Sequence, residues 1–414
     1  MTLKEELEIL RGEPIEVFTG DPMDIPCVET SDPEKLCKHP LVSVHMITYN
    51  HEPYIRQAIE GVMMQKTDFE FELVIGEDCS QDKTREICFE YQKKYPDKVR
   101  VLWWHENLRA LKHPAGGNGQ RNRAHCRGDF IAHCEGDDYW IDPLKLQKQV
   151  DVMRRYPNVG LCYTDVRDHF MSGAIGKQLI VSERLKMPKG VIPGMWFCRM
   201  AILGRDLKRC EREWSGTPTP SVLTRRGIAE EGDRRYEIFR WRLNLGDLQR
   251  WISIASLSDV YFLPEDCTRY HVTTTGALGT LRQRVHCDGV LVRLYFFNKL
   301  WGFSLKDYPP AACDDLIMEF VKSFTDKKNF PERSSYFGRL NFILSCLKNE
   351  GLRSIWFRPS TAMWLGFCMI NYLGHYPFAL MRRLNPIVRA ILFLRPKKEL
   401  SHFCEEIPSP AGQV

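Results

Sequence analysis

The sequence predicts an α/β protein, with a mostly parallel sheet flanked by helices and a helical C-terminal region. Two observations predict this class. Between residues 41 and 164, short runs of β-branched and apolar residues alternate with stretches of helical spacing. Strands that alternate with helices are joined by right-handed crossovers, which make neighbouring strands parallel. After residue 281 only helical patterns follow.

The individual elements follow from their residue patterns. The run LVSVHMIT predicts a strand, and Pro53 then opens a helix whose apolar residues fall on one face. Asp82 and Asp142 each precede another helical pattern and are suited to its N-cap. The expected strands are 41–48, 71–76, 99–103, 130–134 and 159–164, followed by 217–226 and 263–272.

The length of 414 residues suits two or three domains. Residues 1–40 are rich in proline and form an N-terminal extension. Residues 41–280 form the predicted α/β domain. Residues 281–414 form the helical region, with helices expected at 285–303, 312–324 and 336–347.

The composition indicates which partners and which cellular compartment to expect. Apolar residues make up 43% and charged residues 27%, which suits a globular chain with a sizeable core. The net charge of +5 argues against nucleic acid as a partner. The 15 cysteines include no C-x2-C pair, so zinc sites are not expected. With no export signal at the start, the cysteines indicate a reducing cytoplasm and buried small side chains.

Polar clusters follow three of the predicted strands. They are Thr48-Tyr49-Asn50, Glu77-Asp78-Cys79-Ser80 and Glu135-Gly136-Asp137-Asp138. Ligands of such sheets bind at the carboxyl ends of the strands, so these clusters mark a candidate site. Carboxylates that meet there need a positive charge among them, unless they turn to solvent. A hard divalent cation, Mn²⁺ or Mg²⁺, suits oxygen ligands and phosphate.

These segments resemble the bacterial-type family 2 glycosyltransferases, which have the A-type nucleotide-sugar fold. The resemblance covers residues 41–275. The segments that carry it are VSVHMITYNHEPYIRQAIEGVMMQ, ELVIGEDCSQDKT, GDFIAHCEGDDYWIDPLKLQKQVDVM and VGLCYTD, in the order and spacing of the family. The sequence departs from the family at Glu77, where aspartate is usual, and at Cys79, where glycine is usual. Cysteine takes a positive φ less readily than glycine, so this turn is expected to differ. The loop 105–122 is also atypical.

The resemblance implies a catalytic domain at 41–280, with a nucleotide-binding half at 41–140 and an acceptor half at 141–280. It also implies roles for particular residues. Asp137 is placed near the ribose or the metal, and Asp138 binds the metal through the diphosphate of the donor. A cation there stabilises the departing nucleoside diphosphate. The nucleotide contacts implied are Thr48, Tyr49, Glu77, Asp78 and Asp137.

The later part of the resemblance supplies a base and a further metal ligand. RWRLNLGDLQRWISIAS resembles the G-D-x-x-x-W helix of the family, which places the general base at Asp247. The alternative is that Asp247 is a helix N-cap, and Asp165 is then the next candidate for the base. LPEDCTRYHV resembles the closing strand, where His271 is a candidate metal ligand or else a surface histidine.

The C-terminal region suggests attachment to a membrane. Residues 361–381 contain no Asp, Glu, Lys or Arg, and residues 351–398 contain eight Arg or Lys but no acidic residue. A basic, aromatic and amphipathic stretch suits the inner face of an anionic membrane. The alternatives are a packed helical domain and a true membrane span. The expected location is cytoplasmic, with peripheral attachment.

The function expected from this resemblance is that of a metal-dependent, inverting hexosyltransferase. It moves a single sugar from a nucleotide-diphosphate sugar, with UDP-sugars favoured, to a glycan or lipid-linked acceptor. Synthesis of cell-surface polysaccharide or lipopolysaccharide is the expected setting. The processive Q-x-x-R-W motif is absent, which favours single transfer. The main alternative is a non-catalytic, nucleotide-sugar-binding scaffold. A sugar nucleotidyltransferase is disfavoured because TYNHEP follows the first strand in place of a glycine-rich phosphate loop.

Overall fold

The computed structural model describes residues 2–11, 14–203, 217–243, 246–273 and 282–302. These fall into two compact units. The larger contains the described residues of Glu16–Ala201 and Lys208–Thr280, and the smaller contains helices α1 (Leu3–Arg11) and α11 (Arg282–Trp301). Helix α11 confirms the first predicted C-terminal helix. The predicted segments 312–324, 336–347, 351–398 and 361–381 lie outside the described residues.

The larger unit is built on one ten-stranded sheet, and most of its paired residues lie in parallel pairings. This confirms the predicted fold class. The sheet order is β1-β4-β3-β2-β5-β9-β7-β10-β6, with β8 paired to β10. The strands are β1 (Val28–Thr30), β2 (Val42–Thr48), β3 (Phe71–Glu77), β4 (Val99–Trp103), β5 (Phe130–His133), β6 (Tyr139–Trp140), β7 (Val159–Phe170), β8 (Gly190–Ile192), β9 (Val222–Arg225) and β10 (Asp259–Val272).

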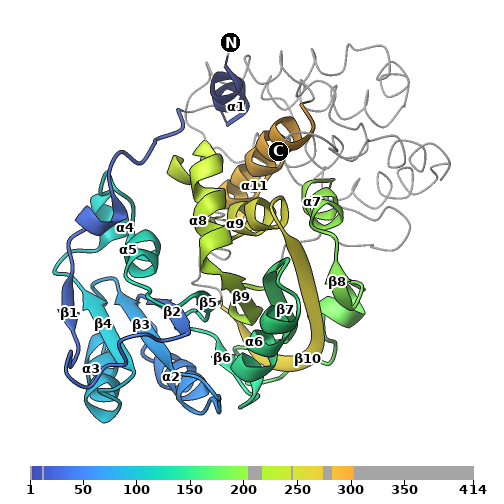
Figure 1. The fold of residues 1–414 in the computed structure, drawn as a ribbon. Helices are drawn as coiled ribbons and strands as arrows, with labels where there is room; N and C mark the ends of the chain where they lie inside the picture. The colour runs from blue at the N-terminus through green and yellow to red at the C-terminus, as the bar shows by residue number, and fades with distance from the viewer. Residues whose placement is uncertain (1, 12–13, 204–216, 244–245, 274–281, 303–414) are drawn as a thin grey trace, which may run out of the picture. The chain divides into compact units, whose positions relative to one another are not determined.

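Helices cover both faces of this sheet (Figure 1). On one face, α2 (Ile55–Met63), α3 (Thr84–Lys94) and α6 (Lys145–Arg155) pack on alternate apolar residues of the strands, such as Val44 and Leu73. The other helices of the unit are α4 (Leu108–Leu111), α5 (Asn118–Ala124), α7 (Gly194–Leu203), α8 (Arg226–Arg235) and α9 (Gly246–Ala255). The segment 105–122, expected to be a loop, therefore contains α4 and the start of α5.

The face of the sheet toward α5 is polar in its centre. Glu72 is buried there and accepts hydrogen bonds from the Ser43 hydroxyl, 2.6 Å away, and from Arg100 and Arg127. His45 and His133 lie opposite each other on β2 and β5, with ring centroids 5.3 Å apart. Burial, with the nearby charge of Arg123, lowers the pKa of His45 to about 3. β2 and β5 thus both carry buried polar side chains on this face of the sheet.

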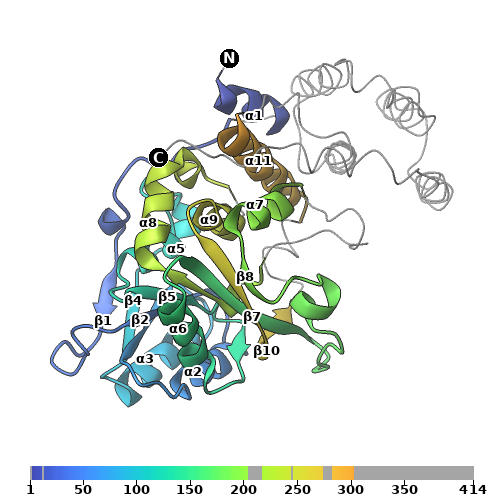
Figure 2. The same ribbon diagram turned by 45° about the vertical axis from the view of Figure 1, so that its right-hand side comes forward.

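The second half of the sheet is dominated by the parallel pair of β7 and β10, which lie side by side in both views (Figure 2). β7 runs from Val159 to Phe170 and so extends well past the predicted strand 159–164. The short strand β9 lies between β5 and β7 and is antiparallel to both. These strands join the predicted nucleotide-binding half and the predicted acceptor half in one continuous sheet.

The smaller unit is described here only in α1 and α11. Arg11 and Asp288 are both buried, and the Arg11 Nε and Asp288 Oδ1 atoms are 3.4 Å apart. Among the described helices, none is long and apolar enough to cross a membrane.

Candidate active site

The three polar clusters meet at one edge of the sheet because β3, β2 and β5 are adjacent and parallel. Backbone hydrogen bonds join the three turns beyond the strands. The amide of Asp78 donates to the carbonyl of Thr48 at 3.1 Å, and the amide of Gly136 donates to the carbonyl of Ile47 at 2.9 Å. The predicted convergence of these clusters is therefore present.

The turn after β3 is held by Glu77. Its carboxylate is fully buried and accepts hydrogen bonds from Arg85 Nε at 2.5 Å and from the amide of Ser80 at 2.6 Å. Cys79 has a φ of 61°, the left-handed conformation that glycine adopts readily. Its thiol donates to the carbonyl of His105 at 3.1 Å. The cysteine therefore takes a positive φ, although its side chain disfavours one.

Asp78 lies in the same turn and is held by α4. Its Oδ1 accepts the amide of Leu108 at 2.8 Å, and Asn107 Nδ2 lies 3.3 Å from Oδ2. Asn107 also caps α4 by accepting the amide of Ala110. Burial raises the pKa of Asp78, although the hydrogen bond from Leu108 opposes this shift. One side chain thus links a short helix to the predicted nucleotide contact.

Arg121 is a functional candidate that the sequence reasoning missed. It is fully buried on α5, and its guanidinium donates to the carbonyls of Glu77 and Pro26 at 3.2 and 3.0 Å. Its positive charge lies close enough to Asp78 to lower the pKa of that carboxyl, against the larger effect of burial. The unusual number of basic residues in 105–122 was the signal for it.

At the end of β2 and in the turn that follows it, two buried polar atoms have no hydrogen-bond partner among the described residues. They are Thr48 Oγ1 and His51 Nδ1. A Cβ atom on Gly136 would lie 2.7 Å from Thr48 Oγ1 and 3.0 Å from His51 Nδ1, so this position requires glycine. Tyr49, by contrast, is exposed beside them. Unpartnered buried groups are rare in proteins and suit a site that binds a polar ligand.

Asp137 and Asp138 differ sharply in exposure. The side chain of Asp138 is 2% exposed, and its Oδ1 accepts the amide of His271 at 2.8 Å. The side chain of Asp137 is 23% exposed, with Oδ2 3.9 Å from His51 Nε2. Asp138 therefore connects β10 to the turn, while Asp137 presents the more accessible carboxylate.

Negative charge is concentrated in this turn. Burial, with the charges of Asp137 and Asp247, raises the pKa of Glu135 to about 8. Burial also raises the pKa of Asp138 well above its usual range, with the charges of Asp137 and Glu135 adding to the effect. Within the described part of the chain, no lysine or arginine pairs with these four acids. These carboxyl groups therefore disfavour the ionisation of one another. Glu135 is one of them, although the sequence placed it in the third polar cluster without a role of its own.

His271 lies on β10 next to the acidic turn. It is only 9% exposed, so it is not the surface histidine of the alternative interpretation. Its Nδ1 hydrogen-bonds to the carbonyl of Asp137, and burial lowers the pKa of the imidazole. A neutral ring that donates from Nδ1 keeps the lone pair of Nε2 for a ligand.

Asp247 is the second residue of α9. Thr219 Oγ1 lies 3.5 Å from its Oδ2, and Oδ1 accepts the amide of the next residue, Leu248, at 2.7 Å. Burial raises the pKa of Asp247. An N-cap would precede the helix and bond two or three residues ahead, which is not the arrangement here. The reserve candidate, Asp165, is fully buried and accepts backbone amides of Val166, Val181 and Ser182.

Residues 43–203 match the family described as Glycosyl transferase family 2. The chain carries a family 2 glycosyltransferase domain. The match contains the three strand-end clusters, whereas Asp247 and His271 lie beyond it.

Curated relatives match over shorter stretches. An uncharacterised protein of Mycobacterium bovis is 40% identical over 133 residues, which are 32% of this chain and 37% of the relative. The putative teichuronic acid biosynthesis glycosyltransferase TuaG of Bacillus subtilis is 34% identical over 116 residues, 28% of this chain and 42% of the relative. The chain thus matches less than half the length of these relatives.

Among solved structures, Staphylococcus aureus TarS 1–349 in complex with UDP-GlcNAc aligns with a TM-score of 0.44 and 14% identity. The alignment covers 74% of this chain and 90% of the TarS chain. A likeness this low supports no inference about ligands.

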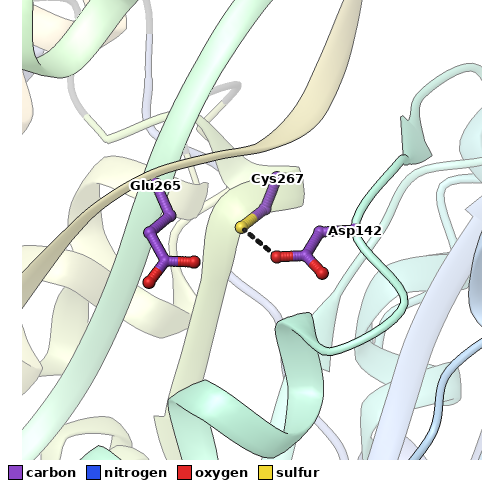
Figure 3. Close-up of side chains that lie close together, drawn as sticks. All are labelled: Asp142, Glu265 and Cys267. Atoms are coloured by element: carbon purple, nitrogen blue, oxygen red, sulfur yellow. Dashed lines mark hydrogen bonds between the residues drawn. The ribbon is translucent and has the colours of Figure 1, made fainter.

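Among the described residues, the group whose ligand atoms are close enough together to hold a metal ion lies outside the acidic turn. It consists of Asp142, Glu265 and Cys267, whose ligand atoms lie within 4.8 Å of one another (Figure 3). The ammonium of Lys148 pairs with both carboxylates and is 2.8 Å from Asp142 Oδ2. Burial raises the pKa of the Cys267 thiol to about 12, which disfavours a thiolate ligand. A lysine thus already supplies the positive charge there.

The left-handed conformation of Cys79 makes a prediction about stability. We expect Cys79→Gly to have a free energy of unfolding higher than that of Cys79→Ala by about 1 kcal/mol, because alanine keeps the strain and glycine removes it. Both variants lose the thiol contact, so their comparison isolates the backbone effect. Urea denaturation followed by circular dichroism measures the difference. An alanine variant as stable as the glycine variant would show that residue 79 does not hold a positive φ.

Proposed function

We propose that this protein is an inverting glycosyltransferase that moves one sugar from a nucleotide-diphosphate sugar to an acceptor hydroxyl. The observation that carries the proposal is the convergence of Glu135, Asp137, Asp138 and Asp247 at one sheet edge within and beside a family 2 domain. Relatives with glycosyltransferase names support the same activity, and TuaG is named for teichuronic acid biosynthesis. We favour a hexosyl transfer in the synthesis of a cell-surface glycan.

In the proposed donor site, Asp78 and Thr48 contact the nucleotide, with Tyr49 exposed beside them. Glu77 has no exposed surface. We therefore assign it the role of stabilising the turn, and not a direct contact with the nucleotide. Asp78 retains acceptor capacity in its carboxylate, which suits a base or ribose donor group. A UDP-sugar is the donor that we favour.

The residues around Asp137 fit a divalent cation, Mn²⁺ or Mg²⁺. The fit rests on crowded carboxylates without a lysine or arginine partner among the described residues, and on the Nε2 of His271, which the hydrogen bond at Nδ1 leaves available. We propose Asp137 and His271 as direct ligands, and Asp138 as the residue that fixes β10 and the turn, or as a further ligand through its second oxygen. A cation bound there would stabilise the charge that develops on the leaving nucleoside diphosphate.

Asp247 is proposed as the base for the acceptor. Its partly exposed carboxylate lies close enough to Glu135 to shift the pKa of that side chain. In the ionised form it would accept the proton of the acceptor hydroxyl as that oxygen attacks the anomeric carbon. Attack from the face opposite the diphosphate inverts the configuration at that carbon.

The first test concerns the cation. We expect EDTA to abolish sugar transfer from a panel of nucleotide sugars and Mn²⁺ or Mg²⁺ to restore it. Asp137→Asn should lower kcat/KM by about 10²-fold or more, because it removes a charged ligand. Asp97→Asn changes an exposed aspartate and is the matched control. Full activity in chelator would remove the cation from the proposal.

A second test concerns the base. Asp247→Asn keeps the size of the side chain but cannot accept the proton, so kcat should fall by about 10²–10⁴-fold while donor affinity stays near wild type. Burial raises the pKa of Asp247, so kcat should begin to fall with decreasing pH at a pH above the usual pKa range of aspartate. Near-normal turnover by the folded variant would contradict the assignment, as would retention of configuration in the product.

We further propose that the protein works at the inner face of a membrane, where a lipid-linked acceptor would be available. The basic, acid-free sequence 351–398 supports this proposal. The full-length protein should co-sediment with anionic vesicles at low salt and be released by high salt, because screening weakens electrostatic attachment. Neutral vesicles are the control. A protein that ignores anionic vesicles at low salt would contradict peripheral attachment.

A further inference from the structure

The ring of His271 is enclosed by three other aromatic side chains. Its centroid lies 4.3 Å from that of His169, 4.9 Å from that of Tyr54 and 5.4 Å from that of Tyr139. The planes of the His169 and His271 rings are inclined by 31°, so the two imidazoles lie against each other in a tilted arrangement. The position of this imidazole is therefore determined by more than its own hydrogen bond.

Strand register brings these residues together. In the parallel pair of β7 and β10, His169 is the direct partner of His271. β6 runs antiparallel to β10 on its other side, and Tyr139 is there the partner of Arg269. Tyr139 and His271 both lie next to the acidic turn, so three strands of the second half of the sheet contribute to this enclosure.

One hydrogen bond distinguishes the enclosure from ordinary aromatic packing. The Tyr139 hydroxyl lies 3.2 Å from His169 Nδ1, so the orientation of the His169 ring is fixed by a polar contact. If these two rings only filled space, residue 169 would need no ring nitrogen and residue 139 would need no hydroxyl. The contact therefore orients the ring that packs against His271.

We propose that His169 and Tyr139 are positioning residues that hold the His271 imidazole so that its Nε2 can bind the divalent cation together with Asp137. This inference rests on the cation site of the proposed function. The Asp137 carbonyl fixes the tautomer of His271 through Nδ1, and the Tyr139–His169 pair fixes the plane of its ring. Partners of this kind, one step removed from a metal, typically change its affinity by about 10–100-fold.

The test measures Mn²⁺ binding to the full-length protein directly, by electron paramagnetic resonance of free Mn²⁺ without donor or acceptor. His169→Phe keeps a ring against His271 but removes the nitrogen, and Tyr139→Phe removes only the hydroxyl. Each should raise the Kd for Mn²⁺ by about 10-fold. The control is Tyr261→Phe. Tyr261 also lies on β10, but its ring packs against Tyr156, so loss of its hydroxyl should leave the Kd unchanged.

Three results separate the possible failures. Unchanged Mn²⁺ affinity in folded His169→Phe and Tyr139→Phe would overturn the positioning role. If the melting temperature of these variants falls while their Mn²⁺ affinity is unchanged, the two residues have a structural role only. Unchanged affinity in His271→Ala would instead overturn the cation site on which the inference rests. If the affinities fall as expected but no nucleotide sugar is turned over, the positioning role stands and the transferase activity fails.

Discussion

Mutual repulsion of carboxylates is the constraint that governs this molecule. Glu135, Asp137, Asp138 and Asp247 come from one turn and one helix that are more than a hundred residues apart in the chain. Burial in a low-dielectric setting makes their repulsion more costly than it would be in water. A cation bound among them, as proposed above, would relieve this repulsion, and without one the surrounding packing must hold the groups together. The long parallel pairing of β7 with β10 and the amide of His271 bonded to Asp138 contribute to that packing.

In the turn after β3, where we propose that the donor binds, arginine side chains of the protein offset the acidic side chains. Glu77 and Asp78 adjoin each other, but Arg85 pairs with the first and Arg121 lies buried behind both. Because these arginines belong to the protein, the turn is complete without any ligand. The acidic turn after β5 has no such partner in the described ranges. The chain thus contains one acidic turn that its own arginines neutralise and, beside it, a second for which we propose a bound cation.

Much of this arrangement could be predicted from sequence, because strand periodicity and the parallel-sheet rule already place the three polar clusters at one edge. What could not be predicted depends on contacts between distant segments. The low exposure of Asp138 follows from β10, which lies far along the chain. The short helix α4 depends on a cap at Asn107 that also binds Asp78. Glu135 was named in a polar cluster but received no role of its own, because its proximity to Asp247 is a property of the fold alone.

The polar face of the central strands has a consequence for how the sheet assembles. Side chains of β2 alternate between the apolar layer, with Val42 and Val44, and the enclosed polar layer, with Ser43 and His45. A slip of one residue would drive Ser43 into hydrocarbon and leave Glu72 without its hydroxyl donor. Most buried sheets in proteins of this class are apolar on both faces and tolerate such a slip better. Here the enclosed polar groups allow a single alignment of β2 with β3, and that alignment brings Thr48 and Glu77 to the same edge of the sheet.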